Sequence, residues 1–303
     1  MDDGMVVVGA DGGEPSLQAV RWAAAEAARR GAPLRVLLAY YWRTPLTAFA
    51  PAGELAETAR RFADMLVADI AREASVAHPE VDVRAVAVPG HPAEVLLKAG
   101  GDAALLVLGT RGRHAATGAV LGSVSQQVAV HARCPVVVVR GRSDPTGDVL
   151  VGVDGSESSD RALAFAFDEA RQRGCGVVAV RAIETPLAPV PVGASPLVYD
   201  TAEVQRALAE QAVEQVAGAS KRCPDVRWEC HGVAGDAADV LVERSQRAQL
   251  VVVGSRGHGG FAGLLLGSVG LRLLHRAHCP VLIAHLPSHG SHHDESGGQA
   301  AAR

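Results

Sequence analysis

A short glycine pattern occurs twice in this chain of 303 residues and limits what the chain can fold into. Gly109-Thr110-Arg111-Gly112 is followed after nine residues by Gly122-Ser123. Gly254-Ser255-Arg256-Gly257 is followed after nine residues by Gly267-Ser268, and Gly254 follows Gly109 by 145 residues. A repeat of this length, in a chain long enough for about two domains, indicates that one domain has been duplicated.

Two further pairs keep almost the same offset. Asp11-Gly12 corresponds to Asp154-Gly155, and Arg133-Cys134-Pro135 corresponds to His278-Cys279-Pro280. We therefore predict one domain over residues 1–142 and a second over residues 148–287, joined by an exposed linker at 141–147. The tail, residues 288–303, is rich in Ser, Gly and His and has no apolar period, so it is predicted to be disordered.

Both halves alternate short β-branched runs with longer amphipathic or alanine-rich segments, which is typical of a parallel sheet wound by crossover helices. The expected strands are 5–8, 34–39, 81–88, 104–108 and 135–140, then 149–153, 176–182, 226–233, 250–253 and 280–284. The expected helices are 15–30, 54–77, 92–99 and 123–132, then 158–173, 202–220, 237–247 and 268–276. Gly31 is expected to close the first helix in a left-handed conformation.

The repeated glycines lie between a buried strand and the start of a helix, where anions bind. Helix N-termini present unpaired N–H groups and the positive end of the helix dipole, and glycine lets a phosphate approach the backbone. The pattern predicts a phosphate cradle in each half, at Gly109, Gly112 and Gly122 and at Gly254, Gly257 and Gly267. Ser123 and Ser268 are expected to cap the following helix and to donate their hydroxyls.

Two other elements should reach the same edge, because doubly wound sheets bind ligands outside the carboxyl ends of their strands. Asp11 and Asp154 follow the first strand of each half. Each carboxylate either accepts hydrogen bonds from a ribose or an adenine, or serves as a turn or N-cap residue. Leu38-Ala39 and Arg181-Ala182 end the second strands, where they either wall an adenine or pack as ordinary strand residues.

Composition argues against several function classes. The formal net charge of −4 does not suit a nucleic-acid partner, which normally needs a concentrated basic face. The chain has no apolar run of membrane-spanning length and no signal-peptide pattern at its start, so we expect a cytoplasmic protein without membrane contact. Cys134 and Cys279 are expected to be buried thiols, and the five cysteines show no zinc or disulfide spacing.

The motif Gly-x2-Gly-x9-Gly-Ser after a strand, with Val-Gly-Val-Asp-Gly-Ser at 151–156 and Cys-Pro-Val before each last strand, resembles the universal stress protein family. The resemblance covers residues 5 to about 286 as a tandem of two domains. It implies an α/β fold in which each domain is a five-stranded parallel sheet of order 3-2-1-4-5 with helices on both faces. It also implies the ATP-binding branch of the family and a regulatory role in stress response or energy sensing.

The ligand implied by the resemblance is ATP, with or without Mg²⁺. In the first half its binding residues would be Asp11, Ala39, Gly109, Arg111, Gly112, Gly122, Ser123, Val124 and Ser125. In the second half they would be Asp154, Ala182, Gly254, Arg256, Gly257, Gly267, Ser268 and Val269. Gly13 and Ser125 of the first half correspond to Ser156 and Gly270 of the second, so the two sites are expected to differ in affinity.

No catalytic residue is predicted. The chain lacks Gly-x4-Gly-Lys-[Ser/Thr], so it is not a P-loop NTPase. His114 and His258, near the loops, are not expected to act in catalysis, and the tail histidines are not expected to bind a metal. Two alternatives to a nucleotide-binding regulator stay open: a slow ATPase or self-phosphorylating protein, and a scaffold that binds no nucleotide.

The last strand of each half, 135–140 and 280–284, is apolar and should lie at a sheet edge. Apolar edges are usually paired or covered, so these two strands are predicted to meet antiparallel and form a pseudo-twofold dimer within one chain. The resemblance also allows a homodimer of whole chains, and the sequence does not identify a regulatory protein partner.

Overall fold

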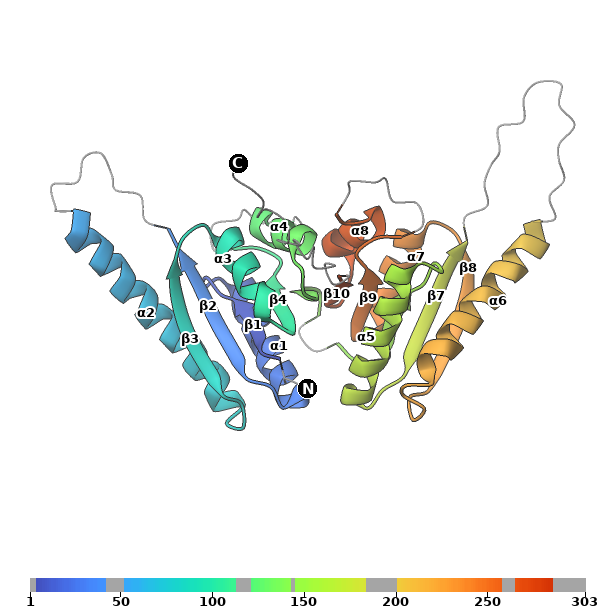
Figure 1. Ribbon diagram of the computed structural model, residues 1–303, viewed down its shortest axis with the longest axis horizontal. Helices are drawn as coiled ribbons and strands as arrows, with labels where there is room; N and C mark the ends of the chain where they lie inside the picture. Colours follow the sequence, from blue (N-terminus) through green and yellow to red (C-terminus); the bar gives the residue numbers. More distant parts are fainter. Residues whose placement is uncertain are drawn as a thin grey trace, which may run out of the picture.

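The computed structural model describes residues 4–41, 52–112, 121–142, 145–183, 201–257 and 265–285. Its two halves are spread like the arms of a V, with β5 and β10 near the centre (Figure 1). The strands of the first half are β1 (Val6–Gly9), β2 (Leu34–Tyr40), β3 (Val83–Pro89), β4 (Leu105–Gly109) and β5 (Val136–Val139). Those of the second half are β6 (Val149–Gly152), β7 (Val177–Ile183), β8 (Trp228–Ala234), β9 (Leu250–Gly254) and β10 (Val281–Ala284).

The helices alternate with the strands. They are α1 (Glu14–Arg30), α2 (Ala52–Ala77), α3 (Pro92–Ala99), α4 (Ser123–His131), α5 (Glu157–Arg173), α6 (Thr201–Ser220), α7 (Ala237–Arg244) and α8 (Ser268–Arg276). Helices α1, α2, α5 and α6 pack against one side of the sheet, and α3, α4, α7 and α8 pack against the other. Strand side chains alternate between these layers: Val6 and Val8 join the core of the first layer, and Val7 joins that of the second.

All ten strands form one continuous sheet in the order β3-β2-β1-β4-β5-β10-β9-β6-β7-β8. Each half thus has the predicted order 3-2-1-4-5, which confirms the expected fold class. Strands within each half are parallel, whereas β5 and β10 are antiparallel, with Val137 opposite Leu282. Both side chains are fully buried, so the join between the halves is part of the core.

Two strands begin two residues later than predicted. Val81 and Val226 are buried, as their β-branched side chains suggested, but each lies in a turn before the strand. The N–H of Val81 donates to the carbonyl of His78, and that of Val226 donates to the carbonyl of Cys223. These turn hydrogen bonds replace the ladder bonds that the hydrophobic pattern suggested.

The helix ends and the linker follow local backbone rules. Gly31 and Gly174 end α1 and α5 in the left-handed region, with φ of 62° and 64°. The described residues of the linker, 141–142 and 145–147, are mostly exposed, yet they are attached to the second half. Gly141 has φ of 74° and lies against the His278 carbonyl, which accepts a hydrogen bond from the N–H of Arg142. The predicted disordered tail lies outside the described residues.

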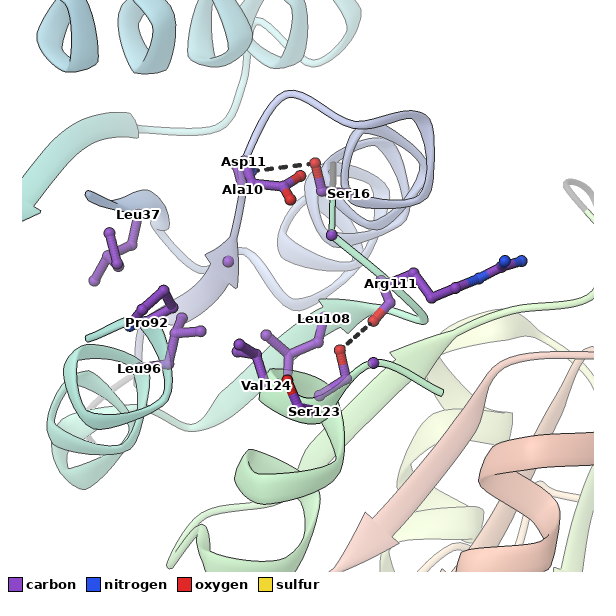
Figure 2. Close-up of a pocket in the computed structure, with 16 residues that line it drawn as sticks. Ala10, Asp11, Ser16, Leu37, Pro92, Leu96, Leu108, Arg111, Ser123 and Val124 are labelled. Atoms are coloured by element: carbon purple, nitrogen blue, oxygen red, sulfur yellow. Dashed lines mark hydrogen bonds between the residues drawn. The ribbon is translucent and has the colours of Figure 1, made fainter. Parts of the chain in front are cut away.

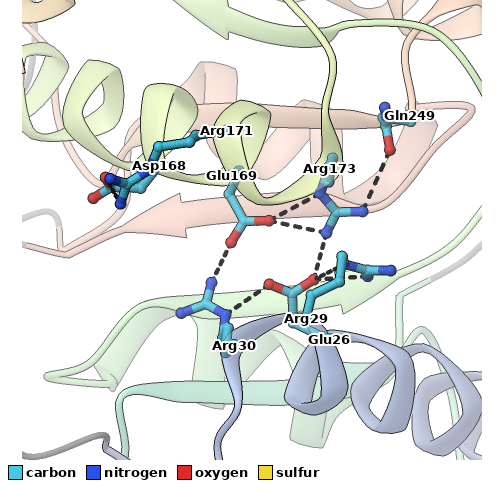
Figure 3. Close-up of polar contacts among 8 residues, drawn as sticks. All are labelled: Glu26, Arg29, Arg30, Asp168, Glu169, Arg171, Arg173 and Gln249. Atoms are coloured by element: carbon cyan, nitrogen blue, oxygen red, sulfur yellow. Dashed lines mark hydrogen bonds and ion pairs between the residues drawn. The ribbon is translucent and has the colours of Figure 1, made fainter. Parts of the chain in front are cut away.

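Four charged side chains join the last turns of α1 and α5 in a buried ring (Figure 3). Glu26 accepts hydrogen bonds from Arg30 and Arg173, each at 2.6 Å. Glu169 accepts one from Arg173 at 2.9 Å and another from Arg30. The two carboxylates are at most 1% exposed, so this ring is an interior contact between the two halves.

Candidate functional site

A cavity of about 480 Å³ opens at the carboxyl ends of β1 and β4 in the first half (Figure 2). All nine residues predicted for the first site line this cavity: Asp11, Ala39, Gly109, Arg111, Gly112, Gly122, Ser123, Val124 and Ser125. The glycine loop, the β1–α1 turn and the end of β2 therefore come together around one space. This volume lies within the usual range of about 300–1,000 Å³ for small-molecule pockets.

Asp11 occupies the turn between β1 and α1. Its Oδ1 accepts a hydrogen bond from the N–H of Gly13 at 2.9 Å, and its own N–H donates to Ser16 Oγ at 3.2 Å. The N-cap of α1 is Gly13, so Asp11 is a turn residue and not a cap. Its other oxygen, Oδ2, faces Gly112, where an added Cβ would lie 2.7 Å away. The carboxylate thus both shapes the turn and borders the glycine loop.

The glycine loop is built from close backbone approaches. A Cβ on Gly109 would overlap the carbonyl of Pro15 at the start of α1. The N–H of Gly122 donates to the Thr110 carbonyl at 2.7 Å, which brings the two ends of the loop together. These contacts explain why glycine recurs at these places whether or not an anion binds there.

The predicted helix caps were wrong by one residue. Gly122 and Gly267 are the N-cap residues of α4 and α8, in extended conformations with ψ of 151° and 158°. Ser123 and Ser268 are the first helical residues, and neither helix has a side-chain cap hydrogen bond. Glycine is the N-cap residue because its backbone N–H closes the loop at this point. The first N–H groups of each helix therefore face the loop.

The side chain of Arg111 points away from the other labelled residues of the cavity, toward the second half (Figure 2). Its backbone, by contrast, belongs to the loop. Ser125 is buried, and its Oγ donates to the Gly109 carbonyl at 2.7 Å, so this hydroxyl ties α4 to the end of β4.

The remaining wall of the cavity is apolar. Ala39 lines this wall, whereas Leu38 belongs to the core on the opposite side of the sheet. Pro92 and Leu96 of α3 complete this wall and were not predicted, because an apolar helix start carries no binding motif. Their position directly after β3 was the available signal, since loops after parallel strands share one edge of the sheet.

The second half repeats the framework of the loop. Gly257 faces Asp154, with an added Cβ 2.5 Å from Oδ2, and Gly267 N–H donates to the Ser255 carbonyl at 2.8 Å. Gly254 lies against Ser158, which corresponds to Pro15 of the first half. The remaining predicted residues, Ala182, Arg256, Ser268 and Val269, lie at the end of β7, in this loop and in the first turn of α8.

The turn after β6 differs from its counterpart. Ser156 caps α5 and donates its hydroxyl to Asp154 Oδ1 at 2.5 Å, in addition to a backbone hydrogen bond at 3.0 Å. Arg181 turns away from the loop face and lies near Gly155. The two carboxylates, Asp11 and Asp154, therefore have different hydrogen-bonding environments.

The cysteines offer no nucleophile. All five are free thiols, and Cys134 and Cys279 are buried, as predicted. Burial raises the pKa of Cys134 to about 11 and that of Cys279 to about 12, so both thiols stay protonated near neutral pH.

Among the described residues, no three His, Cys, Asp or Glu side chains form a group that could hold a metal ion. Within the same ranges, no helix is both long and apolar enough to cross a membrane. His114, His258 and the tail histidines 289, 292 and 293 lie outside the described residues.

Comparison with known proteins gives consistent matches. The sequence profile of the universal stress protein family matches residues 5–140 and again 146–285. A universal stress protein of Mycobacterium tuberculosis is 37% identical over 291 residues, which is 92% of this chain and 96% of the relative. One from Mycolicibacterium smegmatis is 36% identical over 294 residues, with coverage of 92% and 96%. The crystal structure of a universal stress protein from Archaeoglobus fulgidus has the same fold, with a TM-score of 0.66 at 19% identity and coverage of 94% and 97%.

Proposed function

Because this chain belongs to the universal stress protein family, with one family domain in each half, we propose that it binds ATP or a related adenine nucleotide in the glycine-loop sites and acts as a regulator. The cavity of the first half carries this proposal. It combines an apolar wall, a carboxylate and a glycine loop that leads into a helix N-terminus. An adenine suits the apolar wall, a ribose hydroxyl suits Asp11, and phosphates suit the loop.

Ligand-dependent contacts, and not turnover, are the proposed mode of action. Rapid phosphoryl transfer needs a metal-holding carboxylate and a group that positions the attacking nucleophile near the terminal phosphate. Asp11 already supports the β1–α1 turn, and the Arg111 side chain points away from the cavity. A slow ATPase or a self-phosphorylating protein is the second candidate, and steady-state turnover of the purified protein separates the two.

The first test is the content of freshly purified protein. Heating should release an adenine nucleotide into the supernatant, where chromatography identifies it. Calorimetric titration of nucleotide-free protein should then show binding of ATP, with or without Mg²⁺. If heating releases no nucleotide and calorimetry detects no binding of added ATP, the loops are structural and the protein is a scaffold that binds no nucleotide.

The second test is Gly122→Glu in the first half and Gly267→Glu in the second. Each added carboxylate would repel a phosphate at the N-terminus of α4 or α8, and neither glycine has a positive φ that forbids a side chain. Calorimetric stoichiometry should fall by one nucleotide for each substitution. Gly122→Ala and Gly267→Ala are the matched controls, because they add a Cβ without charge. Unchanged stoichiometry in both Glu variants would contradict the assignment of the phosphate sites.

A further inference from the structure

Helix α2 carries large apolar side chains on the side that faces away from the sheet. It lies at one outer end of the molecule, where it packs on β2, β3 and α1 (Figure 1). Its inner side is buried through Ala63, Val67, Ile70, Ala71 and Ala74. By contrast, Phe62, Met65 and Val76 are 62%, 66% and 75% exposed. Single exposed apolar side chains are normal on a protein surface, whereas several that form one patch mark a contact site.

The exposed apolar side chains belong to one stripe along the helix. Five exposed residues follow one another at intervals of three, four, three and four positions: Phe62, Met65, Asp69, Arg72 and Val76. At about 3.6 residues per turn, this spacing keeps all five on one side of the helix, opposite the buried Val67 and Ala74. We call these five residues the outer stripe. Their spacing is that of the contact positions by which two helices pack along each other.

The second half shows that the fold does not require such a stripe. At the offset of 145 residues that aligns the two glycine loops, the corresponding residues are Ala207, Glu210, Glu214, Ala217 and Lys221. None of them is a large apolar residue. The exposed valines of α6, Val204 and Val213, are nine positions apart and therefore point to opposite sides of that helix. The outward side of α6 is ordinary solvated surface, and that of α2 is not.

Two charges make the outer stripe self-complementary. Arg72 forms an ion pair with Asp69 at 2.8 Å, and the two side chains are 70% and 63% exposed. Such an exposed pair adds little to the stability of a single helix. The two charges lie on either side of the midpoint between Met65 and Val76. If a second α2 lies antiparallel across the stripe, Asp69 of each helix faces Arg72 of the other, and Met65 of each faces Val76 of the other.

A second copy of this chain is therefore the partner that fits. A twofold interface places the same surface on both copies, so every contact occurs twice. A parallel arrangement would bring the two Asp69 side chains together, which the repulsion of like charges disfavours. The molecule already contains a contact of this kind. The pairs Glu26–Arg30 of α1 and Glu169–Arg173 of α5 meet as a ring of alternating charge between the two halves (Figure 3).

The charges of α2 disfavour a lipid surface as the partner. The helix contains five acidic and three basic residues. Helices that lie on membranes are rich in Lys and Arg on their polar face, because most membrane surfaces are anionic. An acidic helix would be repelled there, whereas a second α2 offers each charge of the outer stripe an opposite one.

We propose that the outer stripe is a homodimer interface, in which two copies of the chain pack α2 antiparallel on α2. Phe62, Met65 and Val76 provide the apolar contact, and Asp69 with Arg72 sets its direction and register. A contact built from one helix of each copy is small, so the dimer has micromolar affinity. The stripe shares no residue with the cavity of the first half, and the proposal does not rest on the proposed function.

The first test is sedimentation velocity of the full chain from low to several hundred micromolar concentration, where the parent should pass from monomer to dimer. Met65→Gln should weaken the dimer roughly tenfold or more, because each dimer loses two buried thioethers. Val204→Gln is the matched control, since it replaces a 50% exposed apolar side chain of α6. Equal dimerisation by the two variants would overturn the proposal. So would a parent that stays monomeric throughout, even if it cosediments with lipid vesicles.

The second test exchanges the charges. Asp69→Arg alone and Arg72→Asp alone each place like charges across the interface, so each variant should dimerise roughly tenfold or more weakly than the parent. An equimolar mixture of the two should regain dimers, because the two arginines of one chain then face the two aspartates of the other. The ion pair within α2 stays broken in both variants, so recovery on mixing comes only from contact between chains. A mixture that associates no better than either variant would contradict the proposed pairing.

Discussion

Gly109 is the place where the loop after β4 passes closest to α1. A Cβ added there would overlap the backbone carbonyl of Pro15, and backbone at a helix start cannot move aside as a flexible side chain can. We therefore expect Gly109→Ala to lower the free energy of unfolding by about 2 kcal/mol through overpacking. Gly101→Ala is the control, because nothing lies within 4 Å of its Cβ position. Urea unfolding of both variants checks this, and equal stability would show that the loop moves aside without cost.

A second prediction for a single residue concerns His285, which should make the free energy of unfolding depend on pH. Its folded pKa of about 4 lies below the ordinary value of 6.5, so the folded protein takes up this proton less readily than the unfolded chain. Its contribution is present above pH 6.5 and is lost as pH falls toward 4, by roughly 1.4 kcal/mol for each pH unit in that window. Urea unfolding at pH 7 and pH 5 should show a smaller loss for His285→Gln than for the parent protein.

At the scale of elements, local patterns predicted what depends on local physics. The β-branched runs predicted the strands, and the glycines predicted the loops. The strand order of each duplicated half was implied by the family resemblance. The buried ring was not predictable in this way. Glu26 with Arg30, and Glu169 with Arg173, are ordinary i,i+4 pairs that resemble solvated helix surface. They become interior because the antiparallel join of β5 and β10 brings the ends of α1 and α5 together. Pro92 and Leu96 were not predicted for the same reason, because the tertiary fold, and no local motif, brings them to the cavity.

Removing one member of the ring should strongly destabilise the contact between α1 and α5. Burial raises the pKa of Glu26, but Arg173, Arg30 and Arg29 outweigh this and lower it to about 2, so Glu26 is ionised. Glu26→Gln would leave two nearly buried arginines with one carboxylate, at a cost of about 3 kcal/mol. The exposed pair of Glu14 and Arg21 is the control, and Glu14→Gln should cost about 0.5 kcal/mol or less. Chemical denaturation measures both, and similar small values would mean that the ring adds no net stability.

At the scale of the whole molecule, the join of β5 and β10 makes two domains into one sheet. Val137 and Leu282 are paired directly across this join, and both are fully buried. Placing Asp at both positions would bring two carboxylates together in a place without water, where charges are costly and like charges repel. Each residue also pairs within its own half, Val137 with Val107 of β4 and Leu282 with Val252 of β9, so the two charges weaken the join and the adjoining edge of each half's sheet.

We therefore expect Val137→Asp with Leu282→Asp to separate the halves and to lower the cooperativity of unfolding. Calorimetry should show a lower first transition, followed by a second one, where the parent protein unfolds as a unit. The control places the same two charges at exposed positions, Ala85→Asp with Val213→Asp, and should melt like the parent. A single transition at unchanged temperature in the Val137 and Leu282 variant would mean that the two halves are held together elsewhere, with the ring of Glu26, Arg30, Glu169 and Arg173 as the remaining contact to test.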